Sequence, residues 1–397
     1  MRILVVCQYY YPEPFRIVDI CEELVKRGHK VTVLTGLPNY PEGNILMEYR
    51  YGKNRNEFRN GVRIVRTFEI GRGNNNIRLF LNYFSFAFSS RLKVKKLEDG
   101  FDVVFVNQLS PVMMACAAVK YKKLRKIPLF LYCLDLWPDS MIAGGIKKGS
   151  IVYNAFKKVS RNIYCKADRI AITSNSFNDY FINEMGLSKE RIAYLPQYTE
   201  EIFSLIKTHK TNKLGFDLVF AGNIGKLQSV ETILKAAFEL RERKDIRFHI
   251  VGDGSNLSFC KKIAGESENV VFYGRKPVEE IPELYRMADA MLITLSDDQV
   301  ISKTLPGKVQ SYMAAGKPIL GAINGETASI IKEAACGYCC PAEDHKGLAE
   351  AIIRFTETDD YDQMGINARK YYEQNYSKDK FFGRLEVMLN DLILFST

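Results

Sequence analysis

The sequence predicts an α/β protein with two domains, each built on a largely parallel β-sheet. Three observations lead to this prediction. The length of 397 residues is too great for one ordinary domain and fits two. A content of 47% hydrophobic and 26% charged residues is typical of globular chains. Short apolar runs alternate with amphipathic stretches, which is the pattern of strands joined by helices.

The first 200 residues open with a complete strand-helix-strand unit. Residues 2–7 form an apolar run, residues 18–27 have the pattern of an amphipathic helix, and a second strand follows at 30–35. Later segments repeat this pattern, with strands at 101–107 and 128–134, a helix at 111–125, and a strand-helix-strand run at 167–197 whose helix Ser174 is expected to cap. We therefore predict a Rossmann-like domain over residues 1–200.

A polar, lysine-bearing linker near residues 200–214 precedes a second domain, which we place at residues 201–397. Its strands are predicted within the apolar runs 216–222, 246–256, 269–277, 288–295 and 319–323. The last segment, residues 378–395, carries the apolar stripe of a helix. The second domain is therefore also predicted to be Rossmann-like.

The stretch from Ser302 to Glu326 predicts a phosphate site. Thr304 is a candidate helix cap, and Pro306 suits the first helical turn because its φ is already helical. Lys303 and Lys308 lie around the start of this predicted helix, where free N–H groups and the helix dipole favour an anion. We expect this segment to bind a phosphate group.

A second loop with similar properties follows the strand at 216–222. Gly222 and Gly225 let the backbone approach a ligand, and a long amphipathic helix begins directly after them. Lys226 is the one cation of this loop. A further glycine turn begins at Gly252, after the next predicted strand. These loops predict a second set of contacts to the same anion.

The loop after the first strand, QYYYPEPFR, contains no glycine and is stiffened by two prolines. It lies at the carboxyl end of the predicted sheet, where open α/β sheets bind ligands. We interpret it as a rigid wall of a binding site, with Arg16 as a phosphate contact. The alternative is that its aromatic side chains only cover the end of the sheet.

Positive charge is concentrated in the first half of the chain. The net charge is +10, and residues 1–200 hold 31 Lys and Arg against 18 Asp and Glu, a balance of +13. Residues 77–96 combine aromatic side chains with a cationic cluster, Arg91, Lys93, Lys95 and Lys96. They predict either a core helix with a solvated basic end or a helix that rests on an anionic membrane surface. No nucleic-acid-binding motif is present, so nucleic acid is not an expected partner.

Three sequence features bear on where the protein acts. The nine cysteines are scattered, and several lie in apolar runs, as is typical of reduced core thiols. The N-terminus lacks a small-residue cleavage site and is interpreted as a strand. No apolar run approaches the ~18 residues that a membrane span needs. We predict a cytoplasmic protein that is peripheral on the inner face of the cell membrane.

The helix followed by AAGKPI and a small-residue strand resembles the nucleotide-sugar site of family 4 glycosyltransferases. The resemblance implies the GT-B fold, in which two Rossmann-like domains face each other across a cleft and the last helix, here 378–395, returns to the N-terminal domain. It also implies a UDP-sugar donor bound by Gly222, Asn223, Gly225, Lys226, Gln228, Gly252, Arg275, Thr304, Leu305, Pro306, Gly307, Lys308 and Ser311. The acceptor side would be formed by Tyr11, Glu13, Phe15, Arg16, Asn39 and Asp139.

Several positions differ from the family pattern. Two family glutamates are replaced by Lys303 and Ser311, and the Arg and Lys of the diphosphate loop by Asn223 and Gln228. A family His-Asp pair reads Leu134-Asp135 here. We predict that Asp135 contacts the acceptor hydroxyl and that Asp135 and Lys303 are the catalytic residues. The alternative for Asp135 is a cap of the following segment.

Five motifs together resemble the L-fucosamine transferase subgroup of bacterial surface-polysaccharide synthesis: PEPFR, GLPNYPEG, DLWPDS, AGNIGKLQSVETI and KVQSYMAAGKPILGAINGE. This resemblance implies transfer of an N-acetylated deoxy-sugar to a polyprenyl-diphosphate-linked saccharide, with retention of configuration and without a metal or other cofactor. Two alternatives are a nucleotide-sugar epimerase of the same fold and a non-catalytic partner subunit that binds sugar nucleotides. Product analysis without acceptor distinguishes the epimerase from a transferase.

Overall fold

The computed structural model describes residues 1–143, 145–206, 215–298 and 300–395. Its internal contacts divide the chain into two compact units. The N-terminal unit contains residues 1–173, 177–195 and 385–397, and the C-terminal unit contains residues 174–176 and 196–384. Most of the predicted linker, residues 207–214, lies outside the described residues.

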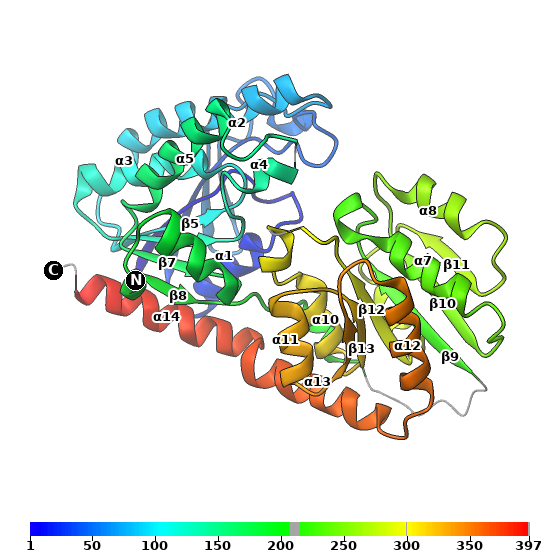
Figure 1. Ribbon diagram of the computed structural model, residues 1–397. Helices are drawn as coiled ribbons and strands as arrows, with labels where there is room; N and C mark the ends of the chain where they lie inside the picture. The colour runs from blue at the N-terminus through cyan, green and yellow to red at the C-terminus, as the bar shows by residue number, and fades with distance from the viewer. Residues whose placement is uncertain (144, 207–214, 299, 396–397) are drawn as a thin grey trace. The chain divides into compact units, whose positions relative to one another are not determined.

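The N-terminal unit is built on an eight-stranded sheet with the order β3-β4-β2-β1-β5-β6-β7-β8. All neighbouring strands pair in parallel except β3 and β4, which are antiparallel. The strands are β1 (Arg2–Val6), β2 (Lys30–Thr35), β3 (Asn56–Arg59), β4 (Val62–Arg66), β5 (Val103–Gln108), β6 (Leu129–Cys133), β7 (Arg169–Ile172) and β8 (Ile192–Tyr194). The helices are α1 (Ile17–Lys26), α2 (Asn76–Lys93), α3 (Cys116–Arg125), α4 (Ser140–Ala143) and α5 (Ile151–Tyr164). Figure 1 shows α2 and α3 side by side over this sheet.

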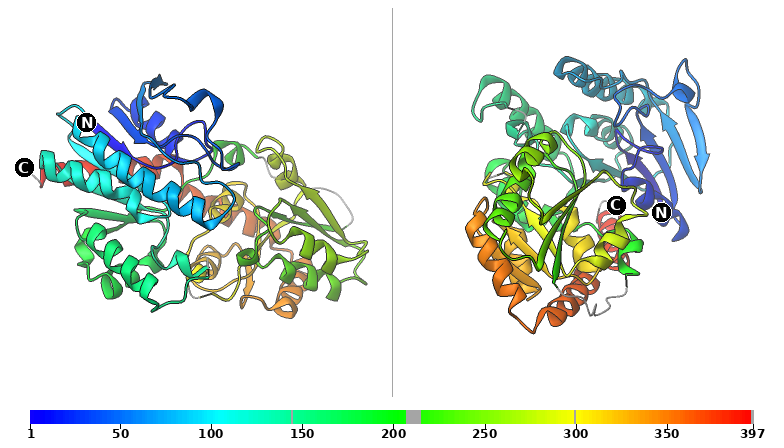
Figure 2. Two further views of the ribbon diagram at one scale, coloured as in Figure 1. Left: turned by 90° about the horizontal axis from the view of Figure 1, so that it is seen from above. Right: turned by 90° about the vertical axis from the view of Figure 1, so that its right-hand side faces the viewer.

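The C-terminal unit has a six-stranded, fully parallel sheet with the order β11-β10-β9-β12-β13-β14. Its strands are β9 (Phe216–Ala221), β10 (Ile246–Val251), β11 (Val270–Gly274), β12 (Ala290–Thr294), β13 (Ile319–Ala322) and β14 (Gly337–Cys340). Its helices are α6 (Glu201–Ser204), α7 (Val230–Glu239), α8 (Leu257–Ala264), α9 (Ile281–Met287), α10 (Gly307–Ala314), α11 (Glu326–Glu333), α12 (His345–Thr356), α13 (Tyr361–Asn375) and the first part of α14 (Lys378–Leu394). Two hydrophobic clusters pack on its strands, and Figure 2 shows helices on both sides of this sheet.

The parallel order brings several loops to one edge of each sheet. In the C-terminal unit, β9, β10 and β12 are neighbours, so the loops after Ala221, Val251 and Thr294 emerge together. In the N-terminal unit, the loops after β1, β2, β5 and β6 do the same. The predicted site residues lie in or beside these loops, as the Rossmann-like pattern requires.

Three local predictions were wrong. Helix α10 begins at Gly307, and Pro306 is its N-cap residue with an extended ψ of 134°, so it is not in the first turn. Thr304 does not cap α10, because its hydroxyl donates to Ile301 O instead. Ser174 does not cap the following turn, because the backbone N–H groups of Asn175 and Ser176 donate to the Glu326 carboxylate.

Helix α14 contributes to both units. From Leu385 onward it belongs to the N-terminal unit, where Leu385 and Leu389 are fully buried. There the Glu386 carboxylate lies 2.9 Å from His29 Nε2 and 3.5 Å from Arg27 Nη1. The apolar stripe predicted for this segment is therefore used in packing. Among the helices of the described residues, none combines the length and the apolar character needed to cross a bilayer.

Candidate functional site

The loop after β9 is held by the loop after β10. Gly222 N donates to Val251 O over 2.9 Å, and Ile224 N donates to Asp253 O over 2.9 Å. Gly252 lies at the closest approach, with a φ of +139°, and a Cβ built there would be 1.8 Å from Gly222 O. Glycine is therefore required at position 252 to let the two loops touch.

Replacing Gly252 with alanine is expected to destabilise the protein by about 3 kcal/mol or more, because the new methyl group meets a backbone oxygen and the φ is strained. Gly265→Ala is the control. It also has a positive φ, of +56°, but no atom lies within 4 Å of its built Cβ, so only the strain remains. Thermal unfolding compares the two variants. Equal losses of stability would contradict the steric explanation.

Asn223 and Gln228, which were predicted to replace the family Arg and Lys, bind each other. Gln228 Oε1 accepts from Asn223 Nδ2 over 2.9 Å and from Gly225 N over 3.2 Å. These bonds close the loop into a compact turn. Lys226 is exposed in this loop, so its cation is accessible and takes no part in these loop-closing hydrogen bonds.

Lys308, in the first turn of α10, is the most unusual group of the C-terminal unit. Its Nζ atom lies 4.0 Å from the centroid of the Phe220 ring, and a Cβ built on Gly222 would be 2.8 Å from it. Within the described residues this buried nitrogen has no hydrogen-bond partner. Burial lowers the pKa of Lys308 to about 7. A buried, unpaired amine beside a glycine loop is suited to an anion that approaches Gly222.

The other predicted residues around α10 have different surroundings. Lys303 is half-buried, and its carbonyl oxygen accepts from the Ser174 hydroxyl. Leu305 is buried, and Gly307 is exposed at the start of the helix. Ser311 bonds inward, to Tyr285 OH over 3.1 Å and to Lys308 O over 2.9 Å. Ser311 therefore links α10 to the core through Tyr285 and does not face a ligand.

Arg275 is exposed directly after β11. The structure therefore brings Gly222, Gly252 and Lys308 together. It leaves Arg275 and Lys226 on the surface of the same unit and turns Ser311 towards the core.

In the N-terminal unit, Glu13 joins two loops at the carboxyl edge of the sheet. Its Oε1 accepts from Asn39 N and Tyr40 N over 2.8 and 2.7 Å, and its Oε2 accepts from Tyr10 N over 3.2 Å. Only 5% of Glu13 and 1% of Asn39 are exposed. Burial raises the pKa of Glu13 to about 7. These two predicted acceptor residues therefore hold the loops in place.

A buried polar cluster around Glu69 continues this arrangement and was missed from the sequence. Its carboxylate accepts from the side chains of Gln8, Asn39 and Asn82 and from Leu37 N. Burial raises its pKa to about 8. The available signal was a single acidic residue three residues after the buried strand β4, but the three side chains that bind it come from distant parts of the chain.

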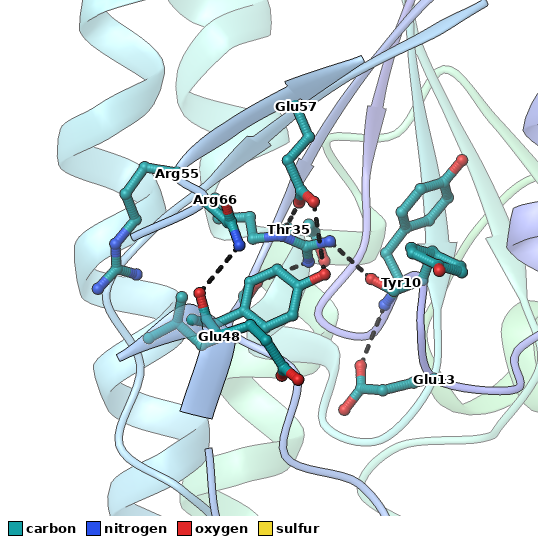
Figure 3. A network of polar contacts seen from close by, with 12 residues as sticks. Tyr10, Glu13, Thr35, Glu48, Arg55, Glu57 and Arg66 are labelled. Atoms are coloured by element: carbon teal, nitrogen blue, oxygen red, sulfur yellow. Dashed lines mark hydrogen bonds and ion pairs between the residues drawn. The ribbon is translucent and has the colours of Figure 1, made fainter. Parts of the chain in front are cut away.

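Arg66 supports the loop that carries Tyr11. Its guanidinium donates to Glu57 over 2.7 Å and to Tyr11 O over 2.6 Å, and it lies 4.6 Å from the Tyr49 ring centroid. Figure 3 shows Arg66 beside Glu57 in this network. The Tyr11 ring is covered by Arg59, whose Cζ is 3.6 Å from the ring centroid. Tyr11 is therefore part of this packed layer.

The half-exposed side of the loop is aromatic. Phe15 stacks on Tyr9 with ring centroids 5.0 Å apart and contacts Tyr40 at 5.1 Å. Arg72 lies 5.3 Å from the Tyr40 centroid. Arg16 is partly exposed at the start of α1. Tyr9 is buried over the sheet end, as the covering interpretation expects, while Phe15, Tyr40 and Arg16 remain accessible. That Arg16 contacts a phosphate stays a prediction.

Asp135 and Asp139, which are close in sequence, have separate environments. Asp135 accepts from the Ser110 hydroxyl, which also lies 3.1 Å from Ser140 Oγ, and burial raises the pKa of Asp135. Asp139 is 2% exposed and accepts from Tyr153 OH. Asp135 is the more accessible carboxylate of the two. Asp139 is buried and its role is the hydrogen bond with Tyr153.

Glu326 is another functional candidate that sequence patterns did not indicate. It begins α11 and is 8% exposed, and its carboxylate accepts from Asn175 N and Ser176 N over 2.9 and 2.8 Å and from the Ser174 hydroxyl. This anchors residues 174–176 to the C-terminal unit.

The sequence of this chain is similar to those of known glycosyltransferases over both units. Residues 15–197 match the model of the glycosyl transferase 4-like domain, and residues 202–371 match that of glycosyl transferases group 1. The chain is 30% identical to the probable glycosyltransferase WbjE of Pseudomonas aeruginosa, over 68% of this chain and 72% of that protein. The chain belongs to the group 1 glycosyltransferases. This glycosyltransferase is also 24% identical to the putative colanic acid biosynthesis glycosyl transferase WcaI of Escherichia coli (strain K12), over 80% of this chain and 82% of that one.

Solved structures confirm the predicted GT-B fold of the glycosyltransferase. Sucrose-phosphate synthase from Thermosynechococcus elongatus superposes with a TM-score of 0.76 at 13% identity, and each chain is covered to 99%. Anabaena Alr3699/HepE, solved in complex with UDP, has a TM-score of 0.71 at 13% identity, covering 98% of this chain and 100% of that one. The prediction of a transferase enzyme is confirmed as well.

Proposed function

We propose that this glycosyltransferase moves an N-acetylated deoxy-sugar, with N-acetyl-L-fucosamine as the first candidate, from UDP to a polyprenyl-diphosphate-linked saccharide. The reaction retains the anomeric configuration, needs no metal, and serves capsule or O-antigen synthesis. The motif set described above supports this choice, as do the names of its relatives, one of which refers to colanic acid biosynthesis.

The observation that carries the proposal is the buried, unpaired amine of Lys308 beside Gly222. A diphosphate that approaches the Gly222 backbone would give this amine its missing partner. Lys226, Lys303 and the 304–307 backbone would add positive potential as negative charge develops on the leaving diphosphate. Structural neighbours solved with UDP and UDP-glucose support a uridine nucleotide as the leaving group.

On the acceptor side, Asp135 would accept a hydrogen bond from the attacking hydroxyl. Three accessible side chains would contact the acceptor directly: Phe15, Tyr40 and Arg16. Four further residues would position the loops that carry them, without touching the acceptor: Tyr11, Glu13, Asn39 and Asp139. Gly252 would likewise act by positioning the Gly222 loop, and Arg275 would contact the uracil base.

The enzyme would work at the inner face of the cell membrane. Helix α2 supports this, because Ile77, Phe80, Phe84 and Phe88 are 74, 50, 39 and 67% exposed. Apolar side chains with this exposure next to a basic segment are suited to the interface of an anionic bilayer. The core interpretation applies to the other face of α2, where Asn82, Phe86 and Ser90 are buried.

A thermal-shift series tests the donor. UDP and UDP-N-acetylated deoxy-sugars are expected to raise Tm, since a ligand at 100 times its Kd stabilises by about 2.7 kcal/mol. GDP and NAD serve as controls, and EDTA should leave the UDP shift unchanged. Shifts with NAD but with no uridine nucleotide would refute the proposal. Transfer to a lipid-linked saccharide, with no epimer formed when acceptor is omitted, then identifies the reaction.

A further inference from the structure

The N-terminal unit contains a pocket that has no role in the proposed transfer reaction. It has a volume of ≈ 860 Å³ and lies where α3 and α5 end, beside the last turns of α2. Seven of its lining residues are Lys or Arg, and one, Asp168, is acidic. Such an excess of positive charge in a concave site attracts an anion.

Two of these cations hold the pocket together. Lys122 Nζ lies 2.6 Å from Asp168 Oδ2, and Asp168 Oδ2 accepts from Leu129 N over 2.7 Å. Arg191 donates to Cys165 O over 2.9 Å. These bonds join α3 to the segment that leads into β7, so hydrogen bonds and an ion pair fix the walls of the pocket.

The other five cations are available to a ligand. They line the pocket without an ion pair to any carboxylate of the described residues, and all but one are exposed: Arg91, Lys120, Lys123, Lys126 and Lys166. Because like charges repel, this cluster is unfavourable when empty and is relieved by an anion.

The pocket is continuous with the apolar face of α2. Arg91 follows Phe84 by seven residues and Phe88 by three, so the three side chains share one face of the helix. Leu92 is 49% exposed at the same end. Figure 2 shows α2 beside α3, which carries most of the lysines. Positive charge and exposed aromatic surface therefore meet at one place.

The pocket is on the edge of the sheet opposite to Asp135. Leu129 begins β6, and Asp135 follows its end at Cys133. At about 3.3 Å per residue, the five-residue strand separates the two places by ~16 Å. A lipid diphosphate bound in the pocket would hold its sugar away from Asp135, so the pocket is not suited to the acceptor.

We propose that this pocket binds the phosphate headgroup of an anionic membrane phospholipid, while the exposed face of α2 enters the interface. The inference rests on the proposed membrane association and assigns to it a specific lipid site. The five available cations would contact the phosphate and its negatively charged neighbours, and the acyl chains would extend over Phe84 and Phe88.

Vesicle flotation tests the proposal with the full-length protein. We expect binding to phosphatidylglycerol-containing vesicles and little binding to pure phosphatidylcholine. Lys123→Gln with Lys166→Gln should weaken partitioning about 30-fold, since each surface cation contributes ~1 kcal/mol. The control, Lys26→Gln with Lys30→Gln, removes the same charge from exposed positions elsewhere in this unit and should have a smaller effect.

A local readout separates the pocket from general charge attraction. Cys165 lines the pocket and is the one exposed cysteine of the nine. Dihexanoyl phosphatidylglycerol below its micelle concentration should slow its alkylation several-fold, and inorganic phosphate at the same concentration should not. Equal protection by phosphate would identify a free-anion site and overturn the proposal.

Failure of the pocket can be distinguished from failure of membrane association. If Phe84→Ser with Phe88→Ser abolishes flotation while the lysine double variant floats normally and Cys165 stays reactive, the lipid site is refuted and the membrane association stands. If the wild-type protein does not float at all, both are refuted. The UDP thermal shift should be the same in every one of these variants.

Discussion

Replacing Lys308 with methionine is expected to raise Tm by roughly 3–8 °C and to weaken UDP binding roughly 10- to 100-fold. The stability gain follows from the environment of Nζ, which is buried against Phe220 and has no hydrogen-bond partner in the part of the chain that the structure describes. Methionine keeps a similar length and polarizability but needs no hydrogen bond. The binding loss follows because a charge-assisted contact to the diphosphate disappears.

Lys226→Met is the matched control. Lys226 lies on the facing loop and is exposed, so its replacement should leave Tm nearly unchanged while it also weakens UDP binding. Differential scanning calorimetry and titration calorimetry measure the two effects. A Lys308→Met protein with reduced Tm and normal UDP affinity would show that Lys308 is only structural.

The Tm difference between wild type and Lys308→Met should depend on pH in a direction that follows from the pKa of Lys308. The pKa of Lys308 is about 7 in the folded protein, below the ordinary value near 10.5 that it regains on unfolding. Below pH 7 the buried amine is charged, and the folded protein bears the full free-energy cost of burying that charge. This cost decreases as pH rises from 7 to 10.5. The Tm difference between Lys308→Met and wild type should be largest at pH 6 and should vanish near pH 10.

UDP affinity should change with pH as well. Because a bound diphosphate favours the protonated amine, UDP binding takes up a proton above pH 7. Affinity should therefore fall as pH rises from 7 to 8.5, and the proton uptake should be absent in Lys308→Met. Titrations in buffers of different ionisation enthalpy measure it.

Replacing Asp135 with asparagine is expected to lower kcat about 10²- to 10⁴-fold, the range of a group that exchanges a proton in the transition state. UDP affinity should not change, because Asp135 belongs to the N-terminal unit. The neighbouring hydroxyls of Ser110 and Ser140 would still find an oxygen on the amide. The loss should therefore be one of chemistry and not of folding.

Asp139→Asn is the contrasting control. Its carboxylate accepts from Tyr153 OH inside the unit, so its replacement should lower Tm and leave kcat within a few-fold. Burial raises the pKa of Asp135, so its reactive carboxylate form is lost at a higher pH than for an exposed aspartate. The rate should thus fall on acidification in wild type but not in Asp135→Asn. Equal kcat values for wild type and Asp135→Asn would eliminate Asp135 from the reaction.

Sequence periodicity was sufficient for most of the elements and for the fold class, but it did not indicate the strands β3 and β14. The run at 2–7 and the amphipathic stretch that follows gave β1 and α1 to within a residue or two, because burial between helices requires continuous apolar strands. The start of α10 was less predictable, since proline and threonine each fit more than one position near a helix terminus.

The roles of the site residues were only partly predictable. Glu13 and Asn39 were predicted as site residues only because they lie in loops at the carboxyl end of the sheet. In the structure both are buried, and the hydrogen bond between them joins two loops. The partners of Glu69 come from residues 8, 39 and 82, and no local pattern connects these. Hydrogen bonds between distant segments depend on how the strands are ordered in the sheet.

The amino-acid sequence by itself determined that the chain forms two α/β units, because strand burial, helix amphipathicity and glycine loops are local properties. The resemblance of its motifs to family 4 enzymes, and not periodicity, indicated a glycosyltransferase. Only the tertiary structure decided that the Lys308 amine, next to Gly222, has no hydrogen-bond partner among the described residues and that Asp139 accepts a hydrogen bond from Tyr153. The same is true of the lysines that gather beside α2. The physical reason is that solvation and charge depend on neighbours brought together by folding, and one residue's sequence context does not contain them.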